Sequence, residues 1–249
     1  MTIDSFVFSD PGGRKRNEDS ARVFSCGDLS CFVLCDGLGG HLGGDLASQC
    51  VCNAIQTFFT ANDGPAKAES LAALLGRAVC GAQEALVDLQ SANGISGGLL
   101  TTLCCLLLRS GDAAAVYVGD SRIYRFSGGR AVARTKDHSV PQHLVNIGEL
   151  PESGVRGHED RSRLLRVMGT DWEDPMFQPF PIDLPLVSGD AFLLCSDGFW
   201  EPVLESDMER LLADTHSAED WARRMAALVP ERVAPREQDN YTAITVRIP

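Results

Sequence analysis

The sequence predicts an α+β fold, in which strands and helices are grouped along the chain. Segments rich in β-branched and aromatic residues cluster near the start of the chain, in its middle and in its last third. Helical patterns separate these clusters. A parallel α/β sheet would need a helix between consecutive strands, and this regular alternation is missing, so α+β is favoured.

Apolar segments bounded by Gly, Asp and Asn mark the expected strands. They cover residues 3–9, 20–25, 31–36, 99–109, 113–120, 122–127, 130–135, 177–183, 191–198 and 241–248. The Ser-Gly-Gly of residues 127–129 predicts a hairpin turn between two of them.

Apolar residues spaced three and four apart predict long helices at 44–60 and 67–90. In the second, Leu71, Leu74 and Leu75 begin a continuous apolar stripe. Further helices are expected near 206–213 and 217–229, and a short helical piece near 142–148.

One segment, residues 139–162, is polar and rich in Gly, Pro, His and Arg, which predicts a surface excursion. Neither an internal repeat nor a low-complexity linker divides the chain. We therefore expect a single domain over residues 1–249.

Composition excludes several classes of function. The 249 residues carry a formal net charge of −12, which argues against binding to nucleic acid or to an anionic membrane. The N-terminus lacks a basic segment followed by an apolar core, and the apolar stretch 99–108 is too short to span a bilayer. A soluble cytoplasmic protein is expected, without a membrane or nucleic-acid partner.

The nine cysteines include no C-x-x-C pair, so a zinc ribbon or a thioredoxin-like site is not expected. Most of them lie in apolar runs, as Cys31, Cys104 and Cys195 do. This placement favours reduced thiols in the core.

Carboxylates recur at the ends of the expected strands. Asp36, Asp120 and Asp197 each end a strand, Asp239 precedes the last one, and Asn17-Glu18-Asp19 precedes the second. If the strands lie side by side, these groups converge and repel one another, and divalent cations such as Mg²⁺ or Mn²⁺ would relieve the repulsion. The alternative is that each is an ordinary turn residue.

Eight motifs occur in an order that resembles the metal-dependent protein phosphatases of type 2C (the PPM family), in their compact bacterial form. They are GGRKRNEDS (12–20), DGLGGH (36–41), TT (101–102), GDSR (119–122), KDHS (136–139), RVMG (166–169), LLCSDGFW (193–200) and DNYTAITV (239–246). The resemblance implies a four-layer α-β-β-α sandwich, with two antiparallel β-sheets flanked by helices.

The resemblance also implies a site for two core Mn²⁺ or Mg²⁺ ions. Asp36 would bridge the ions, and Asp197 and Asp239 would hold the first. The carbonyl of Gly37, and Glu18 through water, would serve the second. Asp19 would support the site from outside, as would be expected in this family.

Arg14, four residues before Glu18, occupies the position of the family's phosphate-binding arginine. An arginine fork suits a phosphate monoester dianion. The implied reaction is direct attack on phosphorus by a metal-bridging hydroxide, without a phosphoenzyme. Arg122 is expected to be structural and to pin the loop after Asp120.

Departures from the family pattern concern a weaker third ion and the proton donor. Asp120 matches a third-ion ligand, but its usual aspartate partner is Glu201 here. Leu38 replaces a histidine that some members carry, and Leu100 replaces a glycine. His41 is a candidate for protonating the leaving group, although a structural role is favoured.

Segment 139–162 matches the family's flap beside the active site, where sequence variation can govern substrate choice. His143 and His158 are candidate flap residues for substrate contact. The simpler interpretation is that they, together with His138, are solvent-exposed loop histidines.

The expected function is hydrolysis of phosphoserine and phosphothreonine in proteins, opposing a bacterial Ser/Thr kinase, with control of type VI secretion as one hypothesis. The expected state is a monomer. One alternative is a non-catalytic binding or sensor module of the type 2C fold, and another is a hydrolase of small phosphate esters. The sequence lacks the motifs of cysteine phosphatases, phosphoaspartate phosphatases and P-loop enzymes.

Overall fold

The computed structural model describes residues 2–39, 43–61, 69–95, 98–182 and 185–249. Its strands are β1 Asp4–Asp10, β2 Asp19–Cys26, β3 Leu29–Leu38, β4 Leu100–Thr101, β5 Leu103–Arg109, β6 Asp112–Val118, β7 Arg122–Ser127, β8 Arg130–Arg134, β9 Gln178–Phe180, β10 Ala191–Cys195 and β11 Tyr241–Arg247. Its α-helices are α1 Gly44–Thr60, α2 Leu71–Ala92, α3 Val140–Asn146, α4 Asp197–Trp200, α5 Glu205–Asp214, α6 Ala218–Ala226 and α7 Leu228–Arg232.

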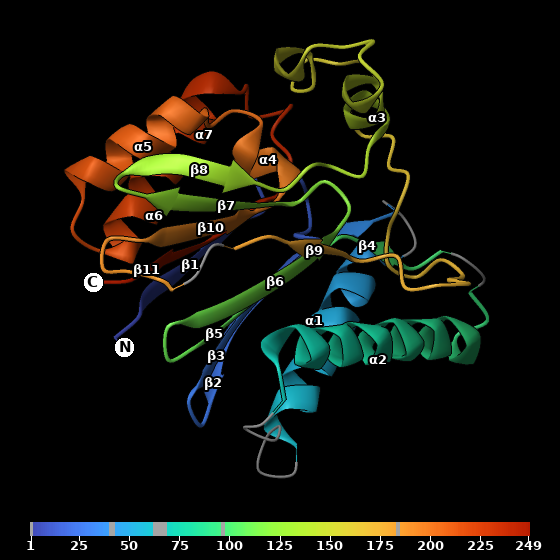
Figure 1. Ribbon diagram of the computed structural model, residues 1–249. Helices are drawn as coiled ribbons and strands as arrows, with labels where there is room; N and C mark the ends of the chain where they lie inside the picture. Colours follow the sequence, from blue (N-terminus) through green and yellow to red (C-terminus); the bar gives the residue numbers. More distant parts are fainter. Residues whose placement is uncertain (1, 40–42, 62–68, 96–97, 183–184) are drawn as a thin grey trace.

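The strands form two antiparallel sheets. One has the order β1-β11-β10-β7-β8, and the other has the order β2-β3-β5-β6-β9, with β4 paired to β3. Helices α1 and α2 cover the second sheet, and α5, α6 and α7 cover the first (Figure 1). The predicted α+β sandwich of two antiparallel sheets flanked by helices is therefore confirmed.

Alternation along the strands divides the interior into three apolar layers. In β3, Cys31, Val33 and Cys35 face the helices α1 and α2, whereas Phe32 and Leu34 face the opposite sheet. The third layer lies between the first sheet and helices α5 to α7. Both faces of each sheet are thus buried, and this is why the central strands are apolar at almost every position.

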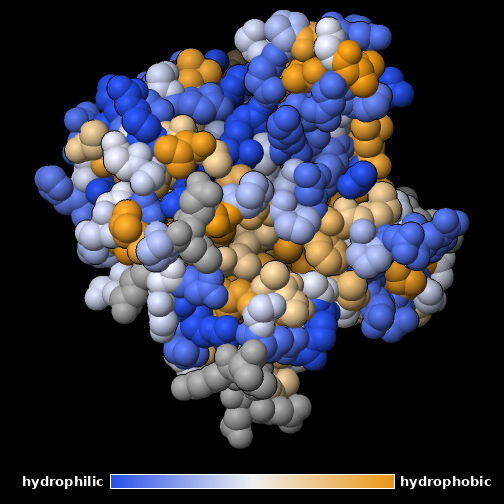
Figure 2. Space-filling view, viewed as in Figure 1, coloured by the Kyte–Doolittle hydropathy of each residue, from blue (hydrophilic) through white to orange (hydrophobic). Residues whose placement is uncertain are grey.

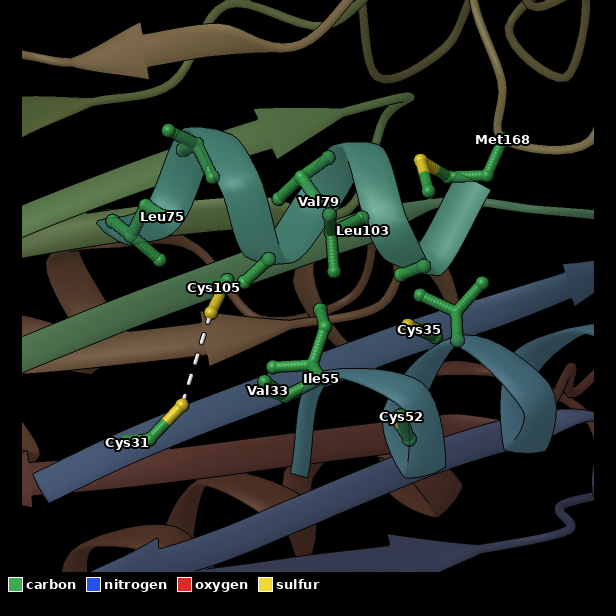
Figure 3. Close-up of a cluster of buried hydrophobic side chains, with 14 of the residues drawn as sticks. Cys31, Val33, Cys35, Cys52, Ile55, Leu75, Val79, Leu103, Cys105 and Met168 are labelled. Carbon is green, nitrogen blue, oxygen red and sulfur yellow. Dashed lines mark hydrogen bonds between the residues drawn. The ribbon is translucent and has the colours of Figure 1, made fainter. Parts of the chain in front are cut away.

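Thiols make up a notable part of the layer beneath α1 and α2. Cys31 and Cys105 lie on adjacent strands with their sulfur atoms 3.9 Å apart, close to Cys35 and Cys52 (Figure 3). All nine cysteines are free. Burial raises the pKa of the Cys31 thiol, so it is held protonated, as an apolar core residue is.

The strand predicted at 99–109 is divided into β4 and β5, and three further predicted elements differ from the observed ones for a local reason. The helix predicted at 217–229 divides near Ala227, because Pro230 cannot donate a hydrogen bond to the preceding turn. The strand predicted at 177–183 is limited to Gln178–Phe180, with prolines inside and after it. The strand predicted at 191–198 ends at Cys195, where the chain turns into α4.

Residues 139–162, called the flap below, project beside one end of the sandwich and contain α3 and a 3-10 turn at Glu152–Gly154 (Figure 1). Apolar side chains gather on the flap and in the middle of this face below it (Figure 2). Within the described ranges, none of the helices combines the length and the apolar character that crossing a membrane requires.

Candidate active site

A cavity of about 500 Å³ opens where β2 and β11 begin and where β3 and β10 end. Four carboxylates that were predicted to converge line it, from segments far apart in the chain. Its lining residues are Arg14, Lys15, Arg16, Glu18, Asp36, Gly37, Leu38, Gly39, Ser162, Asp197, Asp239 and Asn240. The structure therefore brings Glu18, Asp36, Asp197 and Asp239 together in one place.

The backbone of Asp36 is fixed by the paired threonines. The Thr101 hydroxyl and the Thr102 N–H both donate to the Asp36 carbonyl, each at 2.8 Å. The Asp36 N–H donates to the Thr102 hydroxyl at 2.9 Å, and that hydroxyl lies 2.7 Å from the hydroxyl of Ser121. All three partners are buried, so the direction of the Asp36 side chain is well determined.

Two buried glutamines of α2 hold the loop that supports Thr101, and sequence reasoning missed them. Gln83 donates to the Thr170 carbonyl at 2.6 Å and accepts from the Gly169 N–H at 2.8 Å. Gln90 donates to the Gly169 carbonyl at 2.8 Å. Because Met168 and Thr101 form a β-bridge, this contact links α2 to the backbone that holds Asp36. A polar residue within the apolar stripe of α2 was the available signal.

Asp19 lies directly opposite Asp36 in the pairing of β2 with β3. The Ser196 hydroxyl donates to Asp19 Oδ2 at 2.8 Å, while Oδ1 is buried without a hydrogen-bond partner among the described residues. Burial raises the pKa of Asp19 to about 7, against the hydrogen bonds from Thr242 and Ser196 that lower it. Like charges in facing positions of two strands destabilise a sheet unless something compensates them.

Glu18 is positioned by Asn240, a third residue whose role the sequence did not reveal. Asn240 Oδ1 accepts from the Glu18 N–H at 2.8 Å. Its side-chain amide donates to the carbonyls of Pro11 and Arg16, both at 2.9 Å. One side chain before β11 therefore fixes the loop that carries Arg14 and Glu18.

Glycine is required at the cavity because backbone segments meet there without room for a side chain. A Cβ on Gly37 would lie 2.0 Å from the Gly44 carbonyl oxygen, and a Cβ on Gly198 would lie 2.3 Å from that of Asn240. The Gly37 N–H also donates to the Glu18 carbonyl at 3.1 Å. These contacts hold the ends of β2 and β3 together under Asp36.

In the part of the chain that the structure describes, Asp36, Asp120 and Asp197 form no ion pair with a basic side chain. Burial is the largest cause that raises the pKa of Asp36, Asp120 and Asp197, and the charges of neighbouring aspartates raise it further. Oxygen donors with surplus negative charge are the ligands that hard divalent cations prefer, so the residues present fit Mn²⁺ or Mg²⁺.

The described residues contain no group of three or more His, Cys, Asp and Glu side chains arranged to hold a metal ion by themselves. An ion at Asp36 would therefore need donors other than side chains. The Gly37 carbonyl and water are oxygen donors of the required kind.

Arg14 lies at the rim, where its guanidinium donates to Asp239 Oδ2 at 2.7 Å. The two side chains are 61% and 44% exposed, so this ion pair is accessible from the cavity. The hydrogen bond that Arg14 donates to Asp239, and the charge of Asp239, raise the pKa of Arg14. Arg14 thus lies beside Asp239 in the cavity lining, and its phosphate-binding role stays a prediction.

Asp120 and Glu201, the candidate third-ion residues, are not brought into one cavity. Asp120 is buried and lines neither the main cavity nor a second, neighbouring cavity that Glu201 lines. Its backbone carbonyl accepts from Trp200 Nε1 at 2.9 Å. The Glu201 carboxylate accepts from Arg161 Nε of the flap at 2.7 Å. Burial, followed by the charge of Asp197, raises the pKa of Glu201 to about 7.

Arg122 is buried, as expected for a structural residue. It donates to both carboxylate oxygens of Asp137, at 2.8 and 2.7 Å. Its guanidinium lies 3.3 Å from the centre of the Trp200 ring, and it also donates to the Tyr124 hydroxyl at 3.1 Å. These contacts join the loop after Asp120 to α4.

The flap histidines lie away from the cavity. His143 is exposed, and His158 is half-buried, with Nδ1 accepting from the Asp160 N–H at 3.1 Å. Neither lines the main cavity or its neighbour. His41 lies outside the described residues, so the structure does not bear on it.

The expectation that His138 is an exposed loop residue is wrong. His138 is buried and stacks on Tyr117, with ring centres 4.9 Å apart. Its Nδ1 accepts from the Gly119 N–H at 3.1 Å, so Nε2 carries the proton and faces Gln178 Oε1 at 3.1 Å. Burial lowers the pKa of His138, which keeps the ring neutral.

Three arginines attach the flap to α4, to α5 and to β8. Arg156 donates to the Trp200 carbonyl and to Glu205 Oε1, the latter at 2.7 Å. Arg161 pairs with Glu201, and Arg134, just before the flap, pairs with Glu152. A second cavity of about 400 Å³ lies between the flap, α4 and the end of α7, beside Asp197 and Asp239.

Two curated relatives cover nearly the whole chain. The serine/threonine phosphatase stp of Listeria welshimeri is 28% identical over 234 residues, which are 94% of this chain and 90% of that protein. The serine/threonine protein phosphatase PstP of Mycobacterium tuberculosis is 30% identical over 235 residues, which are 94% of this chain and 43% of that protein.

Solved structures match the fold along the full length. Stp1 from Staphylococcus aureus has a TM-score of 0.88 at 28% identity, covering 100% of this chain and 96% of that one. A PstP catalytic domain in complex with two manganese ions has a TM-score of 0.79 at 27% identity, covering 98% of this chain and 97% of that one. PppA, described as a key regulatory component of T6SS in Pseudomonas aeruginosa, has a TM-score of 0.78 at 28% identity, covering 99% and 98%.

A family model described as protein phosphatase 2C matches residues 13–231. This range includes Arg14, Glu18, Asp36 and Asp197, although it ends before Asp239. The resemblance predicted from the ordered motifs is thereby confirmed. The chain belongs to the protein phosphatase 2C family.

Proposed function

We propose that this chain is a metal-dependent phosphatase that hydrolyses phosphoserine and phosphothreonine in proteins. The observation that carries the proposal is the convergence of Glu18, Asp36, Asp197 and Asp239 in one cavity, with Arg14 at its rim. Membership in the protein phosphatase 2C family and the names of the Listeria and Mycobacterium relatives support the same activity.

The surplus negative charge of the cavity supports binding of two core Mn²⁺ or Mg²⁺ ions. The residues that would hold the two ions are Asp36, Asp197 and Asp239 on one side and Glu18 with the Gly37 carbonyl on the other, and water would complete both sets of oxygen donors. Asp19, buried behind Asp36, acts as an outer support. The manganese-bound PstP structure favours Mn²⁺ as the first ion to test.

A third ion at Asp120 and Glu201 would bind more weakly than the two core ions. Glu201 is engaged by Arg161, and Asp120 is buried apart from the main cavity. Binding there would require the Arg161–Glu201 pair to open. The pair is partly exposed, so opening it would cost little.

Divalent ions, when bound, lower the pKa of water and neutralise phosphate charge. The role of Arg14 is to donate two hydrogen bonds to the phosphate oxygens and so to orient the ester. Arg14 can leave Asp239 and bind a phosphate dianion at little cost in free energy, because the Arg14–Asp239 ion pair is largely exposed. The described cavity lining includes no histidine, and we propose water as the proton donor to the leaving serine or threonine.

We propose that the protein acts in the cytoplasm as a monomer and opposes a Ser/Thr kinase. Control of type VI secretion is a narrower hypothesis, supported by the printed description of PppA. Deleting the gene should then raise phosphorylation of the kinase's forkhead-associated target. Unchanged phosphorylation of that target would count against this pathway.

The decisive test compares wild type, Asp197→Asn and Asp88→Asn on a phosphothreonine peptide, with Mn²⁺ or with EDTA. Asp197 lines the cavity, whereas Asp88 is an exposed carboxylate on α2, away from it. We expect turnover only with Mn²⁺, near-complete loss in Asp197→Asn, and normal turnover in Asp88→Asn. A folded wild type that is inert on several phosphopeptides would favour a binding module, and preference for small phosphate esters would favour the other alternative.

A further inference from the structure

The rim of the active-site cavity carries an unusual concentration of positive charge for this chain. Arg14, Lys15 and Arg16 form the only run of three consecutive basic residues in a sequence of net charge −12. All three are exposed, and all three line the cavity. A basic rim therefore surrounds part of a cavity whose floor is acidic.

Lys15 and Arg16 differ from the other basic side chains that line the two cavities, because those other side chains are already in ion pairs. The ion pairs are Arg14 with Asp239, Arg156 with Glu205, Arg161 with Glu201, and Arg232 with Asp207. Within the described residues, neither Lys15 nor Arg16 forms an ion pair or a side-chain hydrogen bond. Their charges are available to a ligand.

The loop that presents these two side chains is held firmly. The Asn240 amide binds the Arg16 and Pro11 carbonyls, and the Arg14 N–H donates to the Pro11 carbonyl at 3.1 Å. A Cβ on Gly12 or Gly13 would lie 2.2 or 2.0 Å from a backbone oxygen of 235–239, so the loop packs tightly on that segment. Binding to a preorganised loop loses less conformational entropy than binding to a mobile one.

We propose that Lys15 and Arg16 select phosphopeptides that carry aspartate or glutamate close to the phosphorylated residue. This inference rests on the proposed phosphatase function and specifies its substrate class. With the phosphate at Arg14, the side chains of the next two residues lie beside the flanking part of the peptide. Charge complementarity there favours acidic flanks and disfavours basic ones.

The selectivity should be one-sided. On the other side of Arg14, the second cavity is lined by paired arginines and by the exposed carboxylate of Glu237. An acidic flank would gain no unpaired cation there and would meet Glu237. The acidic residue is therefore favoured either before or after the phosphoresidue, but not equally on both sides.

The test uses the Mn²⁺-loaded protein and phosphothreonine peptides of equal length. Their flanks are neutral, acidic on the N-terminal side, acidic on the C-terminal side, or basic. For wild type we expect kcat/KM to be about fivefold to tenfold higher for one acidic flank than for the neutral peptide, mainly through KM. The preference should shrink above about 0.15 M salt, because screening weakens exposed charge pairs.

The variant K15Q/R16Q should bring the ratio of acidic to neutral kcat/KM close to one. The control K136Q/R210Q removes one lysine and one arginine that are exposed and line neither cavity. It changes the net charge equally, and it should keep the wild-type ratio. The far-UV circular dichroism of both variants checks their folding.

Three results would overturn the inference: equal kcat/KM for all flanks in wild type, an unchanged ratio in K15Q/R16Q, or an equal loss in K136Q/R210Q. The last would mean that overall charge, rather than the rim, sets the preference. Failure of the proposed function looks different, since then no phosphopeptide is hydrolysed whatever its flanks.

Discussion

Two sets of buried and half-buried charged side chains lie close together in this protein, and they are compensated in opposite ways. Arg122 and Asp137 form two hydrogen bonds, and Trp200 covers the guanidinium. Near them in space, Asp19 and Asp36 face each other across two strands, and neither has a basic partner among the described residues. The chain completes the first set by itself and leaves the second incomplete.

The difference distinguishes charged side chains that stabilise the fold, such as Arg122 and Asp137, from carboxylates that need a bound cation, such as Asp36. Removing one partner of a buried ion pair whose hydrogen bonds are all made strongly lowers the free energy of unfolding. Converging carboxylates instead destabilise the protein until a cation binds, and this cost is typical of functional sites. The comparison predicts opposite effects of substitution in the two sets.

The largest effect is expected at Asp36. Asp36→Asn should lower kcat/KM on a phosphothreonine peptide by about 10³-fold, because a neutral amide is a poor ligand for a divalent cation. In EDTA the same variant should be at least as stable as wild type, since one repelling charge is gone. Thermal unfolding in EDTA measures this, and Asp88→Asn is the control. A large loss of stability in EDTA would place Asp36 with the structural charges.

The next effect is expected at Asp137. Asp137→Ala should lower the free energy of unfolding by about 3–5 kcal/mol, because it leaves the buried Arg122 guanidinium without its counter-charge. Urea unfolding measures the change. Asp160→Ala is the matched comparison, since it removes the exposed Arg163–Asp160 pair and should cost less than about 1 kcal/mol. Equal costs for the two would contradict the distinction between buried and exposed pairs.

The pH dependence of the metal-free protein should reveal the uncompensated set. The pKa of Asp19 is raised to about 7, so between pH 4 and pH 7 the folded state binds more protons than the unfolded state. The free energy of unfolding in EDTA should therefore fall by about 1–3 kcal/mol as pH rises from 5 to 8. Denaturant unfolding at several pH values tests this, and Asp19→Asn should flatten the curve. A rise in stability over this range would show that the carboxylates are compensated.

The smallest effect is expected at the flap. The Arg161–Glu201 pair is 44% and 25% exposed, so Arg161→Gln should change the free energy of unfolding by no more than about 1 kcal/mol. Urea unfolding again provides the measurement. Arg156→Gln should cost more, because Arg156 also donates to the Trp200 carbonyl from a less exposed position. The reverse order would mean that Arg161 carries the attachment of the flap.

Local patterns predicted the elements well, because each pattern is contained in one segment. The helix expected at 44–60 is observed at Gly44–Thr60, and the strand expected at 122–127 is observed at Arg122–Ser127. The order of strands in the sheets was not predictable from such patterns, because it depends on pairing between distant segments. Only the family resemblance supplied the sandwich.

The candidate site shows the same division. Acidic residues at strand ends predicted that Asp36, Asp197 and Asp239 would lie together, and they line one cavity. The residues that hold them, such as Asn240 and Gln90, act through hydrogen bonds to backbone groups many residues away, which no local pattern records. The burial of His138 was missed for the same reason, since its partners are Gly119 and Gln178.

The contacts of Asn240 determine when, during synthesis and folding, the chain can become active. The last strand, β11, inserts between β1 and β10, and Asn240 just before it fixes the loop of Arg16 and Glu18. The site therefore depends on contacts between parts of the chain more than 200 residues apart. Such contacts form late and slowly during folding. We expect a nascent chain to lack phosphatase activity until residues 239–247 have left the ribosome, so no partly synthesised copy can act on substrate.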